Sequence, residues 1–299
     1  MGCRRRARAR RNETVVIRPI SRVVAVVVIA TGLCWGQAAL PPSSPGRVPV
    51  LVELFTSEGC STCPPADRLL EALDTQPVAG LEIVVLSEHV DYWNHLGWKD
   101  RYSSREFSER QSSYASRFHL ADVYTPQMVV DGSAQMSGVA AKELEAALNR
   151  LRSQPKTGMQ ISDPVVDGAR LRVHVSSAAP VLPKGSDSAD VYVAVALNHV
   201  ESQVARGENA NRHLTHAAVV RKLSRVGKIR GGEEFSRDVE LKIDGDEDAS
   251  NLRVVAFLQD PDSRAVLGAA MRRVAASATG SHGAPASPAP APHPGNVNK

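Results

Sequence analysis

Cysteine is scarce in this sequence, because the 299-residue chain holds only four. So few cysteines exclude a small secreted scaffold whose fold depends on many disulfides. No internal repeat occurs at the periods that are typical of solenoid proteins. Acidic residues are almost absent from residues 1–22, where Glu13 stands alone beside eight arginines. The net charge of +4 therefore has its source at the beginning of the chain.

The beginning of the chain has the three parts of a secretory signal peptide. An uncharged, mostly aliphatic run over residues 23–39 follows the arginines, and the small residues Gly36 and Ala38 stand near its end. We therefore predict a signal peptide over residues 1–38 and an exported protein, in the periplasm or outside the cell. The apolar run is close to the minimum length of a membrane span. An uncleaved anchor formed by residues 23–39 is thus the alternative, and only then is a membrane expected as a partner.

Removal of this leader reverses the charge of the protein. Residues 39–299 hold 28 Lys and Arg against 31 Asp and Glu, which gives a net charge of −3. The basic character of the whole chain belongs to the leader, so nucleic acid is not expected as a partner. The remaining chain keeps two cysteines, Cys60 and Cys63, in a CxxC arrangement.

Composition and periodicity divide the remaining chain into four segments. Residues 39–47 are rich in proline and serine and predict a linker. Residues 48–153 have the pattern of an α/β domain, and residues 157–275 show short alternating apolar runs that predict a small antiparallel, β-sandwich-like domain. Residues 276–299 consist mainly of Pro, Ala, Ser, Gly and His without apolar periodicity, which predicts a disordered tail.

The two cysteines lie where a predicted strand is followed by a predicted helix. Residues 48–55 are β-branched and apolar, which indicates a buried strand, and residues 66–73 carry leucines at helical spacing. At the start of a helix, free N–H groups and the helix dipole lower the pKa of a cysteine thiol. The spacing also lets the second sulfur resolve a mixed disulfide. We therefore predict thiol–disulfide exchange, with Cys60 as the nucleophile and Cys63 as the resolving cysteine.

The CxxC spacing leaves two other interpretations open. The pair can be a structural disulfide in a non-catalytic binding module, or it can handle copper or zinc together with a histidine. A structural zinc site usually has four ligands, and the sequence has no second CxxC, so no metal ligand is assigned. No cofactor is expected. The partners expected for exchange are proteins or small thiols and disulfides.

The order of elements after the CxxC resembles the thioredoxin fold. A second apolar strand is predicted over residues 81–86 and a polar helix over residues 103–119; a Thr-Pro pair, a strand, an Asp-Gly turn, another strand and an amphipathic helix follow. The resemblance implies a cis peptide bond before Pro126, with the backbone of Thr125 pairing with an extended substrate. It also implies that Glu53 is the buried acid that relays protons to the second cysteine.

Four segments carry a more specific resemblance. They are residues 52–67 (VELFTSEGCSTCPPAD), residues 89–100 (HVDYWNHLGWKD), residues 207–209 and residues 214–221. Together they resemble the exported bacterial thioredoxin-like family known as domain of unknown function 1223, over about residues 48–274. The resemblance implies the fold and the exported location, and it implies no substrate.

The segment from His89 to Trp98 contains two of the three tryptophans of the chain. It follows the end of the second predicted strand, where the loops of an open α/β sheet line the ligand site. We predict that His89, Asp91 and Trp93 form a rim that holds the substrate near Cys60. The alternative is an aromatic hook that packs the next helix.

The second domain is predicted to contain five strands. They lie around residues 171–175, 191–197, 239–243, 254–258 and 266–271. A run of five basic residues between positions 221 and 230 is interpreted as a solvated face. No chemistry is assigned to this domain from its sequence.

Overall fold

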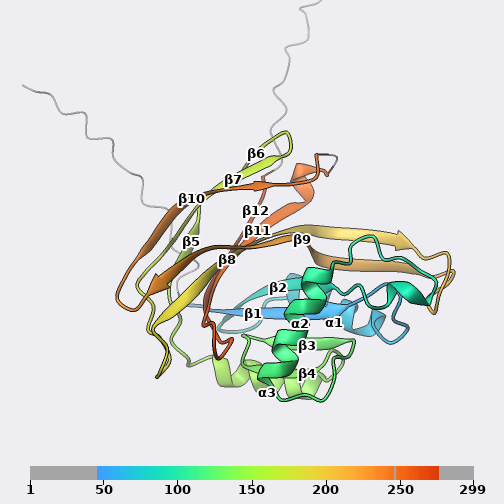
Figure 1. The fold of residues 1–299 in the computed structure, drawn as a ribbon, viewed down its shortest axis with the longest axis horizontal. Helices are drawn as coiled ribbons and strands as arrows, with labels where there is room; N and C mark the ends of the chain where they lie inside the picture. The colour runs from blue at the N-terminus through green and yellow to red at the C-terminus, as the bar shows by residue number, and fades with distance from the viewer. Residues whose placement is uncertain (1–45, 246, 276–299) are drawn as a thin grey trace, which may run out of the picture. The chain divides into compact units, whose positions relative to one another are not determined.

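The computed structural model describes residues 46–245 and 247–275. The predicted signal peptide, most of the predicted linker and the predicted tail lie outside the described residues. Within these ranges the chain has a mixed α/β structure, with one large sheet, one smaller sheet and few helices (Figure 1). None of the helices described here is both long and apolar enough to cross a membrane.

The first half of the described chain alternates strands and helices in the order expected from the sequence. The elements are β1 (Val48–Thr56), α1 (Pro64–Thr75), β2 (Leu81–His89), the 3-10 helix η1 (Asn94–Leu96), α2 (Arg105–Arg117), β3 (Gln127–Val130), β4 (Ala134–Ser137) and α3 (Ala141–Leu151). Pro64 and Pro65 occupy the first helical positions of α1, where no backbone N–H is needed. The Ser104 hydroxyl caps α2 by accepting from the N–H of Glu106.

The second half consists almost entirely of strands. They are β5 (Met159–Ile161), β6 (Val165–Asp167), β7 (Arg170–Ser177), β8 (Ser188–Gln203), β9 (His213–Arg230), β10 (Phe235–Lys242), β11 (Leu252–Gln259) and β12 (Val266–Arg273), with the 3-10 helix η2 (Ala249–Asn251). The five predicted strands are present as β7, β8, β10, β11 and β12. The sequence did not predict β9, because its basic residues interrupt the apolar alternation.

The two halves share one sheet. Its strand order is β12-β11-β8-β9-β2-β1-β3-β4, and the connection between the halves is a parallel pairing of Ser87 on β2 with Val219 on β9. A second sheet, in the order β10-β7-β5 with β6 paired to β7, packs against the part of the large sheet that contains β8 and β11. All strand pairs within the second half are antiparallel.

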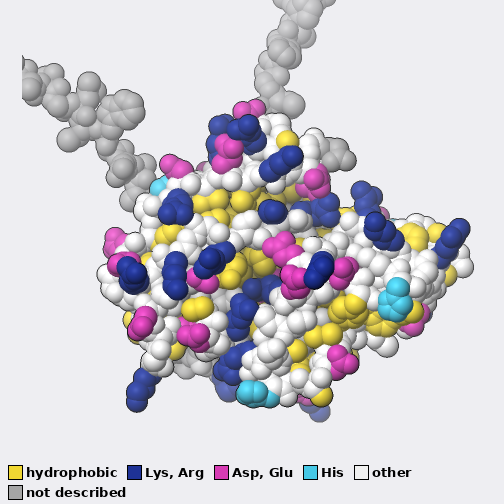
Figure 2. All heavy atoms as spheres, in the orientation of Figure 1, with side chains coloured by type: hydrophobic (Ala, Val, Ile, Leu, Met, Phe, Trp, Pro, Cys, Tyr) yellow, Lys and Arg dark blue, Asp and Glu magenta, His cyan; other side chains and the backbone are white. Residues whose placement is uncertain are grey.

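The basic residues of β9 are distributed among acidic ones. Arg221 contacts the carboxylates of Asp244 and Glu247, and Arg225 contacts Asp190. On the face drawn in Figure 2, basic and acidic side chains are likewise interspersed. The basic side chains Arg221 and Arg225 are therefore paired with carboxylates that are partly buried, Glu247 and Asp190.

Alternate residues of β1 face two different layers. Val52 and Leu54 pack with α1 and α3 on one face of the sheet, whereas Leu51 and Phe55 pack on the opposite face, where α2 lies. This alternation follows from the two-residue period of a strand. It decides which face receives each functional side chain of β1.

Candidate functional site

Cys60 and Cys63 form a disulfide, with their Cα atoms 5.4 Å apart. The pair lies between the end of β1 and the start of α1, and Cys63 is the residue that caps α1. The carbonyl oxygen of Cys63 accepts the N–H groups of Ala66 and Asp67 at 2.8 and 3.1 Å, which begins the helix. Both cysteine side chains are fully buried. The structure therefore holds the oxidised pair, closed off from solvent.

A loop from the second half of the chain covers the disulfide. We call residues 204–212, which join β8 to β9, the cover loop. The side chain of Asn209 is fully buried, and its Nδ2 atom donates to the carbonyl oxygens of Glu58 and Cys60 at 2.9 and 2.8 Å. Beside it, Oε2 of Glu208 accepts hydrogen bonds from the backbone N–H and the hydroxyl of Ser61. The candidate site is therefore built from both halves of the chain.

Gly207 allows the cover loop to come close to the first half. Its φ of +78° is in the left-handed region, and a Cβ atom built there would lie 3.2 Å from the Cβ of Trp98. The indole N–H of Trp98 donates to Oε2 of Glu58 at 2.7 Å. Trp98 therefore connects the cover loop to the residues that precede Cys60.

The Thr125–Pro126 peptide bond is cis, the isomer that the thioredoxin resemblance implies. Gly138 brings this turn close to α1, since a Cβ built on Gly138 would lie 2.8 Å from the Cβ of Ala66 and 2.9 Å from that of Pro126. The Thr125 hydroxyl accepts the indole N–H of Trp93 at 2.8 Å. The turn thus lies next to the helix that begins at the cysteines.

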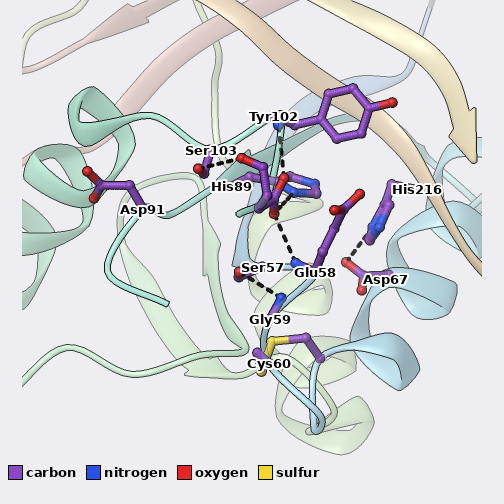
Figure 3. A network of polar contacts seen from close by, with 12 residues as sticks. Ser57, Glu58, Gly59, Cys60, Asp67, His89, Asp91, Tyr102, Ser103 and His216 are labelled. Atoms are coloured by element: carbon purple, nitrogen blue, oxygen red, sulfur yellow. Dashed lines mark hydrogen bonds and ion pairs between the residues drawn. A yellow bond between two sulfur atoms is a disulfide. The ribbon is translucent and has the colours of Figure 1, made fainter. Parts of the chain in front are cut away.

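The predicted rim residues have different surroundings. Trp93 lies between the turn at Thr125 and the residue before Cys60. Its indole N–H reaches Thr125, and a Cβ atom built on Gly59 would lie 3.1 Å from the Cβ of Trp93. His89 is fully buried, and Asp91 accepts the hydroxyl of Ser108 on α2 at 2.6 Å. In Figure 3, Asp91 lies apart from the network, at the left of the view, and its carboxylate points away from Cys60. The structure does not bring the three together as a rim.

Glu53 is fully buried, but the structure does not bring it to the cysteines. Because it alternates with Val52 and Leu54, its side chain points to the face of the sheet opposite to α1. There it accepts hydrogen bonds from Arg110 at 2.6 Å and from the Tyr114 hydroxyl at 2.5 Å. The location of Glu53 therefore contradicts the proton relay to Cys63 that the resemblance implies for it. Val52 and Leu54 on either side of it face α1, so the two-residue period of β1 turns Glu53 to the other face.

Five ionisable side chains are buried in the segments around the disulfide, and Figure 3 labels four of them, Glu58, Asp67, His89 and His216. We call all five the buried cluster: Glu58, Asp67, His89, Asp100 and His216. Asp100 accepts from Nδ1 of His89 at 2.7 Å and from the N–H of Glu58 at 2.9 Å. Burial raises the pKa of Asp100, but these partners outweigh it and hold the pKa at about 2. Asp100 is therefore an anion at neutral pH, and Nδ1 of His89 carries the proton.

His216 of β9 and Asp67 of α1 form the other end of the buried cluster. The His216 ring lies 4.7 Å from the His89 ring, and its Nδ1 atom is 3.4 Å from Oδ1 of Asp67. Burial lowers the pKa of His216, but the carboxylates of Asp67, Asp100 and Glu58 outweigh it and raise the pKa above its usual value. The histidine therefore carries its proton to a higher pH than a free imidazole.

Several polar atoms of the buried cluster have no hydrogen-bond partner among the described residues. They are both ring nitrogens of His216, both carboxylate oxygens of Asp67, Nε2 of His89 and Oε1 of Glu58. Such atoms are rare in folded proteins and often belong to reactive groups. Within residues 46–245 and 247–275, no set of three or more His, Cys, Asp or Glu side chains is arranged to hold a metal ion. Sequence reasoning named only His89 of this cluster, although its five members lie within three of the segments that carry the family resemblance, residues 52–67, 89–100 and 214–221.

Comparisons with known proteins identify a family and two solved structures of similar fold. The family model described as "Protein of unknown function (DUF1223)" matches residues 51–259. No curated protein matches the chain.

Two solved structures resemble most of this chain. A protein from Agrobacterium tumefaciens is 27% identical, with a TM-score of 0.56; the match covers 76% of this chain and 95% of that one. HBP35 of Porphyromonas gingivalis is 13% identical, with a TM-score of 0.53 and coverage of 81% and 80%. The second likeness concerns the fold alone. Since each match covers more than three quarters of this chain, the likeness includes both halves.

Proposed function

We propose that this chain, which belongs to the DUF1223 family of proteins of unknown function, performs thiol–disulfide exchange through Cys60 and Cys63. The observation that carries the proposal is the disulfide itself, which closes the CxxC at the first turn of α1 beside the cis Pro126. A helix start favours the thiolate form of a cysteine, which is the reactive form.

The proposal includes a thioredoxin-like domain over residues 48–153. It is supported by the strand order β2-β1-β3-β4, by the parallel β1–β2 pair and by the cis proline that precedes β3. The β-sandwich-like domain over residues 157–275 would share its large sheet with the first domain. Export, with proteins or small thiols and disulfides as partners, remains part of the proposal.

In the oxidised form seen here, the protein would accept two electrons from a dithiol. A substrate thiolate attacks the sulfur of Cys60, the Cys60–Cys63 bond breaks, and Cys63 leaves as a thiolate that takes up a proton. A second substrate thiolate then attacks the substrate sulfur of the mixed disulfide and releases Cys60. The products are an oxidised substrate and a reduced CxxC. The reverse sequence reduces a disulfide.

Asp67 is the proposed proton acceptor and donor for Cys63. It lies four residues after Cys63 on α1, which places the two on one face of the helix. Both of its oxygens are buried and without hydrogen-bond partners among the described residues, and His216 stands beside it. Asp67 therefore takes the role that the resemblance assigned to Glu53.

The experiment that tests exchange is a measurement of the reduction potential of Cys60–Cys63 on metal-free protein, together with turnover of insulin and glutathione disulfide. We expect a potential between about −270 and −120 mV, the range of exchange proteins, and turnover that the Cys60→Ser variant lacks. A potential below about −300 mV without turnover would instead indicate a structural bridge. Tight, stoichiometric copper or zinc uptake that requires both cysteines would overturn the proposal in favour of metal handling.

A further inference from the structure

Two donors of Ser61 converge on one carboxylate oxygen next to the disulfide. The backbone N–H of Ser61 lies 3.1 Å from Oε2 of Glu208, and the Ser61 hydroxyl lies 2.7 Å from the same atom. Ser61 directly follows Cys60, so these donors lie beside the sulfur that is proposed to react. The arrangement is a small binding site for a carboxylate, and the cover loop supplies its occupant.

The Glu208 side chain, which occupies this site, is held less firmly than the cover loop that carries it. Glu208 is exposed, whereas its neighbour Asn209 is fully buried and anchored by two hydrogen bonds to the backbone before and at Cys60. The hydrogen bonds from Ser61 lower the pKa of Glu208, so its side chain is ionised at neutral pH. An exposed carboxylate in contact with water is easily displaced by another carboxylate. Glu208 can therefore leave Ser61 while Asn209 keeps the loop in place.

We propose that Ser61 forms a carboxylate subsite that Glu208 occupies at rest, and that the exchange substrates are small thiols and disulfides with a carboxylate near their sulfur. This inference rests on the proposed exchange function. A small substrate is favoured over a protein because both cysteines are buried and Asn209 holds the cover loop to the carbonyl oxygen of Cys60. The substrate carboxylate replaces that of Glu208 and brings its sulfur to Cys60.

The reaction of such a thiol balances without another reagent. Its thiolate attacks the Cys60 sulfur, the Cys60–Cys63 bond breaks, and Cys63 takes up a proton. A second molecule of the thiol, as its thiolate, attacks the substrate sulfur of the mixed disulfide and frees Cys60. Two thiols are oxidised to one disulfide, and the CxxC gains two electrons and two protons.

The exchange test compares two reagents that differ only in the carboxylate: N-acetylcysteine and its amide. Rate constants for reduction of Cys60–Cys63, corrected for the thiolate fraction of each reagent, are measured in the full chain. We expect the Glu208→Gln variant to raise the ratio of the acid rate to the amide rate about tenfold over wild type, which is the scale of one charged hydrogen bond. Adding Ser61→Ala to that variant should reverse most of the gain.

A matched control removes the same charge elsewhere. Glu240→Gln alters an exposed ion pair with Arg170 in the smaller sheet and should leave the ratio unchanged. An equal ratio in wild type and Glu208→Gln would overturn the subsite. The same conclusion would follow if Glu208→Gln accelerated both reagents equally, or accelerated only a reduced unfolded polypeptide, because Glu208 would then merely cover the disulfide.

A binding test separates the subsite from the exchange function. N-acetylalanine has the carboxylate but no sulfur, and its addition to Glu208→Gln should shift the amide NMR signal of Ser61. In wild type the shift should need a higher concentration, since Glu208 competes. If neither reagent reduces the disulfide but the signal shifts, exchange fails and the subsite stands. If the signal does not shift, the subsite is wrong even where exchange occurs.

Discussion

Two clusters of buried charge join strands of the large sheet to the helices and loops beside them, and they differ in the kind of cation they contain. On the α2 face, Arg110 contacts Glu53 at 2.6 Å and Glu88 at 3.4 Å. In the buried cluster near the disulfide, the cation is a histidine, His216. Arginine never releases its proton in proteins, whereas histidine can do so near neutral pH. The cation of the Arg110 cluster therefore keeps its proton, whereas the cation of the buried cluster can release it.

The hydrogen bonding of the two clusters differs only in part. Glu53 accepts two bonds, and Gln259 of β11 bonds to both Arg110 and Tyr114, which ties α2 to the second half of the chain. Burial and the charge of Glu53 raise the pKa of Glu88 well above its usual value. Within the described part of the chain, unpartnered polar atoms occur in both clusters, on Glu88 in the first and on Asp67 and His216 in the second. The chemical identity of the cation, rather than the number of hydrogen bonds, therefore distinguishes the two clusters.

The largest expected effect is on stability, from breaking the Arg110 cluster. Arg110→Ala leaves Glu53 buried without its cation, and we expect a loss of about 3–5 kcal/mol in the free energy of unfolding. Urea unfolding of the full chain measures it. Arg105→Ala, which breaks an exposed pair on the same helix, should change stability by less than about 1 kcal/mol. Similar losses in both variants would contradict a structural role for the Arg110 cluster.

The next effect is on rate, from removing the proposed proton acceptor. Asp67→Asn should slow the attack of Cys63 on a mixed disulfide at Cys60 by about 100-fold at pH 7, the scale of general base catalysis. Rapid-quench measurement of this step across pH should show that the variant regains speed as the pH rises. Glu71→Gln on the same helix is the control and should keep the wild-type rate. A variant that is slow at every pH by the same factor would indicate a packing defect.

A smaller effect on stability is expected from Asp100. Its pKa falls from 3.8 to about 2 on folding, so its ionised form contributes about 2 kcal/mol above pH 4. This contribution is lost as the pH falls from about 4 to 2, because protonation then favours the unfolded chain. Asp100→Asn should lack that part of the pH dependence in urea unfolding, whereas the exposed Asp262→Asn should retain it. If the stability of Asp100→Asn kept the full pH dependence between pH 4 and 2, that dependence would come from another group.

The comparison of clusters also shows what sequence can predict. The periodicity of residues 48–153 was enough to predict the strands and helices of the first half, because each pattern is local. The face on which Glu53 lies was not predicted, since a shift of one residue along a strand reverses it. The clusters were missed because their members meet only through distant pairing, such as that of Ser87 with Val219. One observation in the sequence pointed to Glu208 and Asn209: both lie within residues 207–209, one of the segments that resemble the family.

The smallest expected effect comes from His216 and concerns the sign of a pH dependence. Because its pKa is raised in the folded protein, the charged histidine stabilises the fold fully below about pH 6.5, the value in the unfolded chain. This contribution declines as the pH rises through the higher folded-state value. Wild-type stability should therefore fall from pH 6 to 9 relative to His216→Gln, as measured by urea midpoints. His174→Gln, which alters a half-exposed histidine in the smaller sheet, is the control. A wild-type midpoint that rises over this range relative to His216→Gln would mean that His216 is neutral in the folded protein. The buried cluster would then contain no cation at His216 to balance its carboxylates.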